Sequence, residues 1–106
     1  MTSESKYRIR HTVVFKLKHR IGSEEEKQFL DAAKELKKLP GVEKFECLKQ
    51  ISSHNNYTYG ISMEFSDAAS YQAYSDHPGH VRFVEELWMK EVESFMEIDY
   101  QIEDPQ

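Results

Sequence analysis

The sequence predicts an α+β domain in which a four-stranded antiparallel sheet has helices on one face. Four segments alternate apolar and polar residues at a period of two, which is typical of half-buried strands. Two segments have apolar residues at helical spacing, and the elements follow one another as strand, helix, strand, strand, helix, strand. The 106 residues suffice for one domain with a modest core. We expect this single domain to span residues 1–106, with its structured core at about 8–101.

The first strand is expected at residues 9–18. One of its faces carries an imidazole among apolar side chains, in the order Ile9, His11, Val13, Phe15 and Leu17. A histidine in that place needs a hydrogen-bond partner or must face a cavity, because an unpaired polar group is costly to bury. His11 is therefore a candidate pocket residue, and a satisfied core histidine is the alternative.

The first helix is expected to begin after Ser23 and to run for about 16 residues. Ser23 and Glu26 form a capping-box pattern, in which the serine oxygen accepts from the backbone N–H of Glu26 and the carboxylate reaches back. The helix should end at residues 39–41, Leu-Pro-Gly, because proline cannot continue it. Its apolar stripe is formed by Phe29, Ala33 and Leu36.

Two further strands are expected at residues 42–51 and 57–65, joined as a hairpin. The residues between them, 52–56, are Ser, His and Asn, a composition typical of turns. We interpret His54 as a solvated loop residue. The second strand of the hairpin has Tyr57, Tyr59, Ile61, Met63 and Phe65 on one face.

The second helical region is expected to be interrupted. Ser66 is a suitable N-cap for its first part. Pro78 disfavours a helical conformation at the preceding residue and suits the first turn of a new helix, so we expect a break at residues 76–79. Asp76 or His77 should cap the new helix. Its apolar stripe includes a histidine and consists of His80, Val84, Leu87 and Trp88.

The last strand is expected at residues 92–102. One face carries Val92, Ser94, Met96, Ile98, Tyr100 and Ile102, and the other carries Glu93, Glu97, Asp99 and Gln101. The order of elements is that of the ferredoxin-like βαββαβ fold, whose helices cover one sheet face. The other face, with Thr12, Val14 and Ser62, stays open and includes apolar side chains. We therefore expect a homodimer in which two sheets pack through this face.

The composition excludes several classes of partner. The net charge of −5 argues against nucleic acid, which rewards clustered Lys and Arg. No apolar run approaches the roughly 20 residues of a membrane span, and the N-terminus has no hydrophobic signal core. The single cysteine, Cys47, excludes an internal disulfide and is either a small buried hydrophobe or a reactive thiol. A cytoplasmic protein without a membrane partner is expected.

Four segments resemble the stress-responsive A/B barrel (Dabb) family. They are residues 11–17 (HTVVFKL), 39–42 (LPGV), 57–59 (YTY) and 74–81 (YSDHPGHV). The most specific part is the His-Pro-x-His-Val motif, combined with the histidine of the first strand. The resemblance covers almost the whole chain and implies a dimeric α+β barrel of ferredoxin-like protomers. Most members have no established reaction, some are plant proteins linked to stress stability, and one closes a linear polyketide by an aldol reaction.

The resemblance also implies site residues. By motif match, the catalytic histidine and tyrosine of the polyketide cyclase fall on His80 and Tyr74, and its first-strand pocket histidine falls on His11. Another pocket histidine falls on Tyr59, where this sequence departs from the family and the phenol changes the shape and hydrogen bonding of the pocket. His77 is a further substrate-binding candidate, with a purely structural role in the loop as the alternative.

These residue types suit acid–base chemistry. An imidazole can take a proton from a carbon next to a carbonyl, and a phenol can donate to the oxygen on which charge develops. The alternative is that His80 only bridges backbone groups at the helix break. Asp76, His77 and His80 are close in sequence, but a zinc site needs three or four converging ligands. We expect no metal and no cofactor.

Three function classes follow from these observations. The first is a stress-associated homodimer whose small internal pocket binds a small molecule without turnover. The second is an enzyme that needs no cofactor, a cyclase or lyase that acts on a carbonyl compound through His80 and Tyr74. The third, a cofactor-free monooxygenase of the antibiotic-biosynthesis type, rests on analogy between folds.

Overall fold

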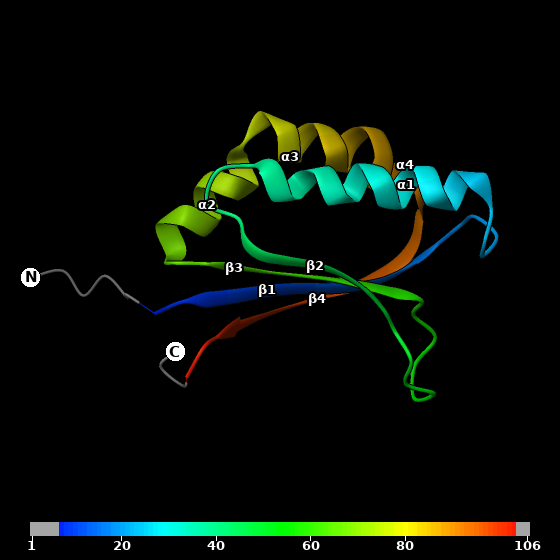
Figure 1. Cartoon of the computed structure of the whole chain (residues 1–106), viewed down its shortest axis with the longest axis horizontal. Helices are drawn as coiled ribbons and strands as arrows, with labels where there is room; N and C mark the ends of the chain where they lie inside the picture. The colour runs from blue at the N-terminus through cyan, green and yellow to red at the C-terminus, as the bar shows by residue number, and fades with distance from the viewer. Residues whose placement is uncertain (1–6, 104–106) are drawn as a thin grey trace, which may run out of the picture.

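Residues 7–103 are described by a computed structural model, which has the predicted order of elements. A four-stranded sheet lies beneath a layer of helices, as Figure 1 shows. Its strands are β1 (Ile9–Leu17), β2 (Glu43–Lys49), β3 (Tyr59–Phe65) and β4 (Val92–Gln101), in the spatial order β2-β3-β1-β4 with every neighbouring pair antiparallel. This is the arrangement of the ferredoxin-like fold.

The first helix begins as the capping pattern predicts. Helix α1 (Glu24–Lys34) continues as a 3₁₀ turn, η1 (Glu35–Lys38). The Ser23 oxygen accepts from the backbone N–H of Glu26 at 3.2 Å, and the Glu26 carboxylate accepts from the N–H of Gly22 at 2.9 Å. The chain then turns at Gly41, whose φ of 87° is a conformation that favours glycine.

The second helical region is broken where the proline predicts. Helix α2 (Ala68–Asp76) ends at His77, and helix α3 (Pro78–Phe83) begins directly after it. The expected N-cap Ser66 was wrong, because the Asp67 carboxylate accepts from the N–H of Ser70 and thereby caps α2.

Beyond α3 the backbone widens. A π-helical turn, η2 (Val84–Trp88), leads to a short helix α4 (Met89–Glu91). The backbone N–H of Met89 bonds the carbonyl of Val84, five residues earlier. Such turns are rare and are found frequently at functional sites.

Aromatic rings fill the space between the sheet and the helices. Phe29 of α1 is 1% exposed and lies 5.9 Å from the Phe15 ring, 5.6 Å from the Phe83 ring and 6.1 Å from the Trp88 ring, measured between centroids. Phe15 and Phe65, on the two central strands, are fully buried. This core fixes the distance between the helices and the sheet, and thereby the height of any cavity between them.

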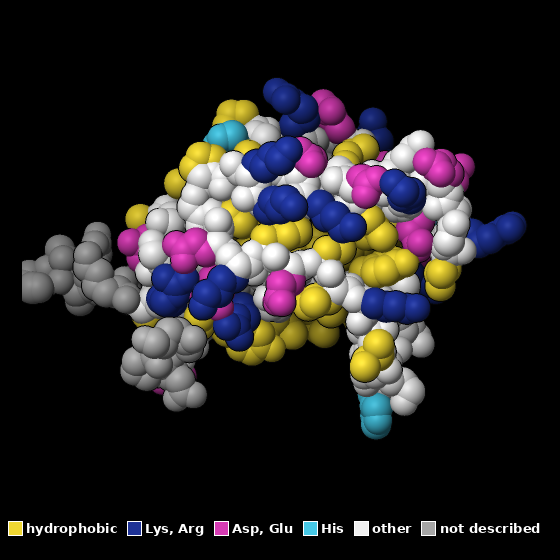
Figure 2. Space-filling view, viewed as in Figure 1, with side chains coloured by type: hydrophobic (Ala, Val, Ile, Leu, Met, Phe, Trp, Pro, Cys, Tyr) yellow, Lys and Arg dark blue, Asp and Glu magenta, His cyan; other side chains and the backbone are white. Residues whose placement is uncertain are grey.

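The opposite sheet face is uncovered and partly apolar. Figure 2 shows hydrophobic side chains along the lower side of the molecule, away from the helices. Cross-strand partners share a face, so the pairs Val14–Met96 and Thr12–Ile98 belong to this side. Its exposed large apolar side chains are Leu48, Met96, Ile98 and Tyr100.

A carboxylate covered by basic side chains lies on the same face. Glu64 is 2% exposed although it points away from the core. It pairs across the central strands with Arg10, whose guanidinium bonds it closely, and it accepts from Arg8 at 3.1 Å. Arg10 is the largest cause of a lowered pKa for the Glu64 carboxyl, and Lys44 lies 3.6 Å away.

Candidate functional site

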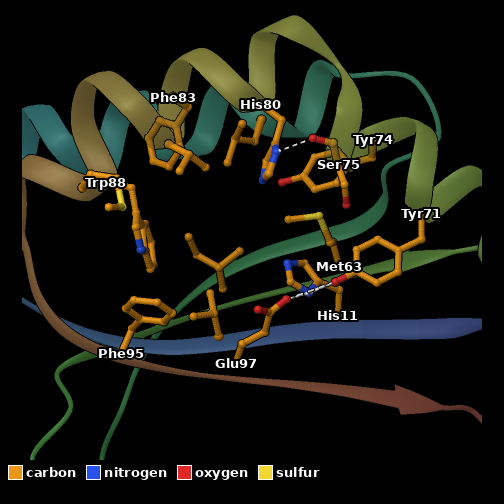
Figure 3. A pocket seen from close by; sticks show the side chains of 15 residues that line it. His11, Met63, Tyr71, Tyr74, Ser75, His80, Phe83, Trp88, Phe95 and Glu97 are labelled. Carbon is orange, nitrogen blue, oxygen red and sulfur yellow. Dashed lines mark hydrogen bonds and ion pairs between the residues drawn. The ribbon is translucent and has the colours of Figure 1, made fainter.

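A cavity of about 240 Å³ lies between the helix-covered face of the sheet and the α2–α4 segment (Figure 3). The walls are mainly apolar. Trp88 and Phe95 meet edge to face at one end, with ring centroids 5.5 Å apart. Polar side chains gather at the other end, from α2, α3, β1 and β4: His11, Tyr71, Tyr74, Ser75, His80 and Glu97. The cavity therefore combines an apolar chamber with a polar wall, as ligand sites usually do.

The helix break orients His80 toward this cavity. Pro78 occupies the first turn of α3, and the His77 imidazole caps that helix by accepting from the Gly79 N–H at 2.9 Å. One turn later, His80 Nδ1 lies 3.0 Å from the carbonyl oxygen of Ser75. A carbonyl can only accept, so Nδ1 carries the proton and donates it, and Nε2 keeps its lone pair. Burial lowers the pKa of His80, which favours this neutral form.

Tyr74 lies next to His80. The two ring centroids are 4.6 Å apart, and Figure 3 shows the phenol ring beside the imidazole. Tyr74 is 2% exposed, and burial, with a smaller contribution from the charge of Glu97, raises the pKa of its hydroxyl well above the ordinary range. The hydroxyl therefore stays protonated at neutral pH and can donate a hydrogen bond.

His11 lies on the sheet side of the cavity, within a cluster of four polar residues. Its Nδ1 is 2.6 Å from Asp99 Oδ1 and 3.4 Å from Glu97 Oε2. The Tyr71 hydroxyl is 2.7 Å from Asp99 Oδ2, 3.1 Å from Glu97 Oε2 and 3.0 Å from His11 Nδ1. Burial is the main cause of a strongly raised pKa for Tyr71, and the Asp99 carboxylate adds to it.

The structure brings three of the five residues predicted from the sequence together. His80, Tyr74 and His11 line the same cavity, and the ring centroids of His11 and Tyr74 are 6.3 Å apart. Tyr59 lies elsewhere: it shares the helix-covered face but packs on Phe15 at 6.1 Å and does not line the cavity. Burial, followed by a hydrogen bond with Glu26, raises the pKa of Tyr59 to about 12.

His77 also lies outside the cavity lining. Its Nδ1 accepts the Gly79 N–H, so the contact that His77 makes is the structural one, within the loop, and not a contact with the cavity. Asp76 extends from the end of α2, where it accepts from the Gln72 amide at 3.1 Å. Asp76, His77 and His80 are therefore each hydrogen-bonded to a different residue, and none of these contacts joins two members of the set.

Sequence reasoning missed the two carboxylates of β4 as site residues. Glu97 and Asp99 were grouped on one face of the last strand, but nothing indicated that this face lies under the helices. The register settles it, because Asp99 is the cross-strand partner of His11 and Glu97 is the partner of Val13. The available signal was the apolar stripe of the same strand. Since that stripe suits the uncovered face, the carboxylates are left on the helix-covered face, where Glu97 lines the cavity and Asp99 lies against His11.

The fold and this cavity define a class of small α+β proteins with a ligand-sized chamber between sheet and helices. A family model, that of the stress-responsive A/B barrel domain (Dabb), matches residues 9–102. The chain therefore belongs to the Dabb family. No curated protein matches it. Across residues 7–103, none of the helices has the length and apolar character needed to cross a membrane.

Solved structures agree with this assignment. A Dabb family protein from Mesorhizobium loti with a ferredoxin-like fold is 55% identical, with a TM-score of 0.89 over 92% of this chain and 99% of that one. A hydroxynitrile lyase from Passiflora edulis has a TM-score of 0.82 at 15% identity, over 96% and 99% of the two chains. A protein from Arabidopsis thaliana has a TM-score of 0.79 at 20% identity, over 92% and 98%. The last two similarities concern the fold alone.

Proposed function

We propose that this Dabb protein binds a small carbonyl compound in the cavity and transfers a proton from it to His80. The volume sets the scale of the group that the cavity can enclose. An engineered protein cavity of about 150 Å³ holds benzene, so about 240 Å³ admits one ring with a short substituent. The apolar walls would bind the hydrocarbon part, and the groups at the polar end would bind the carbonyl oxygen.

The observation that carries the proposal is the hydrogen bond from His80 Nδ1 to Ser75. It leaves the Nε2 lone pair as the basic position of a neutral imidazole. A base of this kind can remove a proton from the carbon next to a carbonyl, while the Tyr74 hydroxyl donates to the oxygen that gains negative charge. The resulting enolate is the reactive species of aldol-type ring closure and of the reverse cleavage, which are the cyclase and lyase reactions expected from the sequence.

Ligand binding can be measured with a probe that the chain already contains. Trp88 is the single tryptophan and lines the cavity, so its fluorescence should change saturably on titration with cyclohexanone. Val84→Phe, which places a ring into the cavity, should abolish this change. Val81→Phe is the matched control, because Val81 is 39% exposed and is not part of the cavity lining. Equal titration curves for the two variants would contradict binding in this cavity.

Proton transfer can be followed separately, as exchange of the α-protons of cyclohexanone into D₂O by NMR. His80→Gln should lower the protein-catalysed exchange rate by about 10²-fold or more, the usual contribution of a positioned base. His54→Gln, in the exposed turn, is the control and should leave the rate unchanged. If binding persists but wild type and His80→Gln exchange at the same rate, the protein binds without turnover, which is the first of the three classes.

We further propose that two copies pair through the uncovered sheet faces and that the protein is cytoplasmic. Exposed Met96, Ile98 and Tyr100 support pairing, and ferredoxin-like proteins from Bacteroides fragilis and Thermobifida fusca are described as dimeric. Ile98→Lys should weaken the dimer, since it places a charge in an apolar interface. Light scattering that finds wild-type monomers at micromolar concentration would contradict the pairing.

A further inference from the structure

We propose that His11, Glu97 and Asp99 form a binding site for a divalent transition-metal ion, of the type of Zn²⁺, at the polar wall of the cavity. These residues differ from Asp76, His77 and His80, the three neighbours in sequence that were weighed above as zinc ligands. The three residues offer one imidazole nitrogen and two carboxylate oxygens that all lie within 4.8 Å of one another. Mixed imidazole and carboxylate ligands suit Zn²⁺, Mn²⁺ and Fe²⁺.

The backbone holds these ligands in place. His11 on β1 and Asp99 on β4 are cross-strand partners, and Glu97 lies two residues before Asp99 on the same face of β4. Donor atoms around a zinc ion with bonds of about 2.1 Å are about 3.0–3.4 Å apart. His11 Nδ1 is already 3.4 Å from the Glu97 oxygen and 2.6 Å from the Asp99 oxygen. Small side-chain rotations would therefore complete the ligand set, without movement of the strands.

The cluster has too few protons for its close contacts. The His11 Nδ1 position and the Tyr71 hydroxyl can each supply one hydrogen, and ionised carboxylates only accept. Nevertheless, the Tyr71 oxygen lies within 3.1 Å of both carboxylates and 3.0 Å from His11, and His11 approaches both carboxylates as well. One hydrogen on Tyr71 cannot bridge all of these contacts, and a cation among them would satisfy the oxygens that no hydrogen serves.

The neighbouring residues do not supply that charge. Across residues 7–103, the ion pairs of Glu97 and Asp99 are made with His11 alone. Arg8 and Arg10 are on the other side of the sheet, bound to Glu43 and Glu64. Two carboxylates beside one imidazole thus leave a net negative charge at the cavity wall. A divalent ion would neutralise it and take the Nδ1 lone pair, and Tyr71 would remain as a hydrogen-bond donor to the ligating carboxylates.

An ion held there would have open coordination positions toward the cavity, because His11 and Glu97 both line it. Catalytic zinc sites have this arrangement, with three protein ligands and a free position that polarises a bound carbonyl. Metal binding itself does not depend on the function proposed above, since it is measured directly on the protein without any carbonyl compound.

The test is titration of the EDTA-treated protein with Zn²⁺ by calorimetry, with the visible absorption of added Co²⁺ as a second readout of ligand geometry. One ion should bind per chain. Glu97→Gln and Asp99→Asn, which keep the side-chain shape and alter partly exposed residues, should each weaken binding at least tenfold. Loss of a hydrogen-bond partner of a metal ligand already weakens metal affinity by about tenfold or more, so loss of a ligand should weaken it at least as much.

The chain supplies a matched control. His19 and Glu91 form another imidazole–carboxylate pair, with Nε2 and Oε1 2.6 Å apart, outside the three-residue set. Glu91→Gln should leave the dissociation constant unchanged. Absence of saturable binding at 100 µM Zn²⁺ (a concentration of the order at which weak sites still fill), or affinities that Glu97→Gln and Asp99→Asn do not change, would overturn the proposal. Circular dichroism of each variant checks that the fold is retained.

Discussion

Replacing Glu64 with glutamine should lower the free energy of unfolding by about 2 kcal/mol, although the residue faces away from the core. A hydrogen bond to a charged group contributes about 1.5–3 kcal/mol, whereas an exposed ion pair contributes about 0.2–1 kcal/mol. Glu64 is 2% exposed, but Arg8 and Arg10 are 32% and 45% exposed and can regain water. The interaction with each of the two arginines is therefore worth about 1 kcal/mol, between the two limits.

The assay is urea denaturation at pH 7 and fixed protein concentration, followed by Trp88 fluorescence. In a parallel thermal melt, a loss of about 2 kcal/mol corresponds to a decrease in Tm of about 8–16 °C for a domain of this size. Glu93→Gln is the control, because its oxygen lies 3.7 Å from Lys16 and both side chains are about half exposed. That variant should change stability by at most about 0.5 kcal/mol. Equal midpoints for the two variants would refute the claim that burial determines the contribution.

The pH dependence provides an independent check on Glu64. Because its pKa is lower in the folded protein than the unperturbed value of 4.5, its contribution is complete above that value and is lost as the pH falls through the folded pKa. The difference between wild type and Glu64→Gln should therefore shrink on acidification below about pH 4.5. A difference that stays constant down to pH 2 would show that the carboxylate charge does not contribute.

Three further outcomes are expected. Phe29→Ala should cost about 3–5 kcal/mol in urea denaturation, since it empties a fully packed site, and Phe95→Ala, at 52% exposure, should cost less than half as much. Asp67→Ala should cost about 1 kcal/mol through loss of the N-cap, whereas a comparable loss in Ser66→Ala would contradict the observed cap. As the pH falls below 6.5, wild type should lose stability relative to His80→Gln by up to about 1.4 kcal/mol per pH unit. The reason is that the lowered pKa of His80 in the folded protein lets the unfolded state bind this proton more readily. Parallel pH profiles of the two proteins would contradict a buried, neutral His80.

The parts of this fold that could be predicted depend on local patterns. Alternation places His11 on a buried strand face within nine residues of sequence, and Pro78 fixes the helix break from its ring geometry alone. Tyr74 and His80 lie on either side of that break, so their proximity is also a local property. Ser66 and Asp67 are both good N-caps, and propensity does not separate adjacent candidates.

The remaining features depend on pairing between distant segments. Which face of β4 lies under the helices is decided by its register with β1, some 80 residues earlier in the chain, so the role of Glu97 was not visible in the sequence of β4. Tyr59 shares a face with the cavity residues, yet it packs on Phe15 and does not line the chamber, whereas Phe95, the partner of Phe15 on the other side, does. The strand and the position along it, and not the face alone, together decide which side chains reach a cavity.

The π-helical turn at Val84–Trp88 makes the size of the cavity adjustable by a single deletion. A turn of this kind contains one residue more than an α-helical turn, so the loss of one residue can restore regular geometry without breaking the helix. The residues after the turn would keep roughly their present orientation, because the wide turn takes up its extra residue within itself, and the change would fall on the turn, whose five residues would become four. His80, which precedes the turn, would keep its position, while the side chains that the turn presents to the cavity, among them Val84 and Trp88, would be rearranged. Loss of a single codon could thus change which ligands this protein accepts while leaving its proposed base in place.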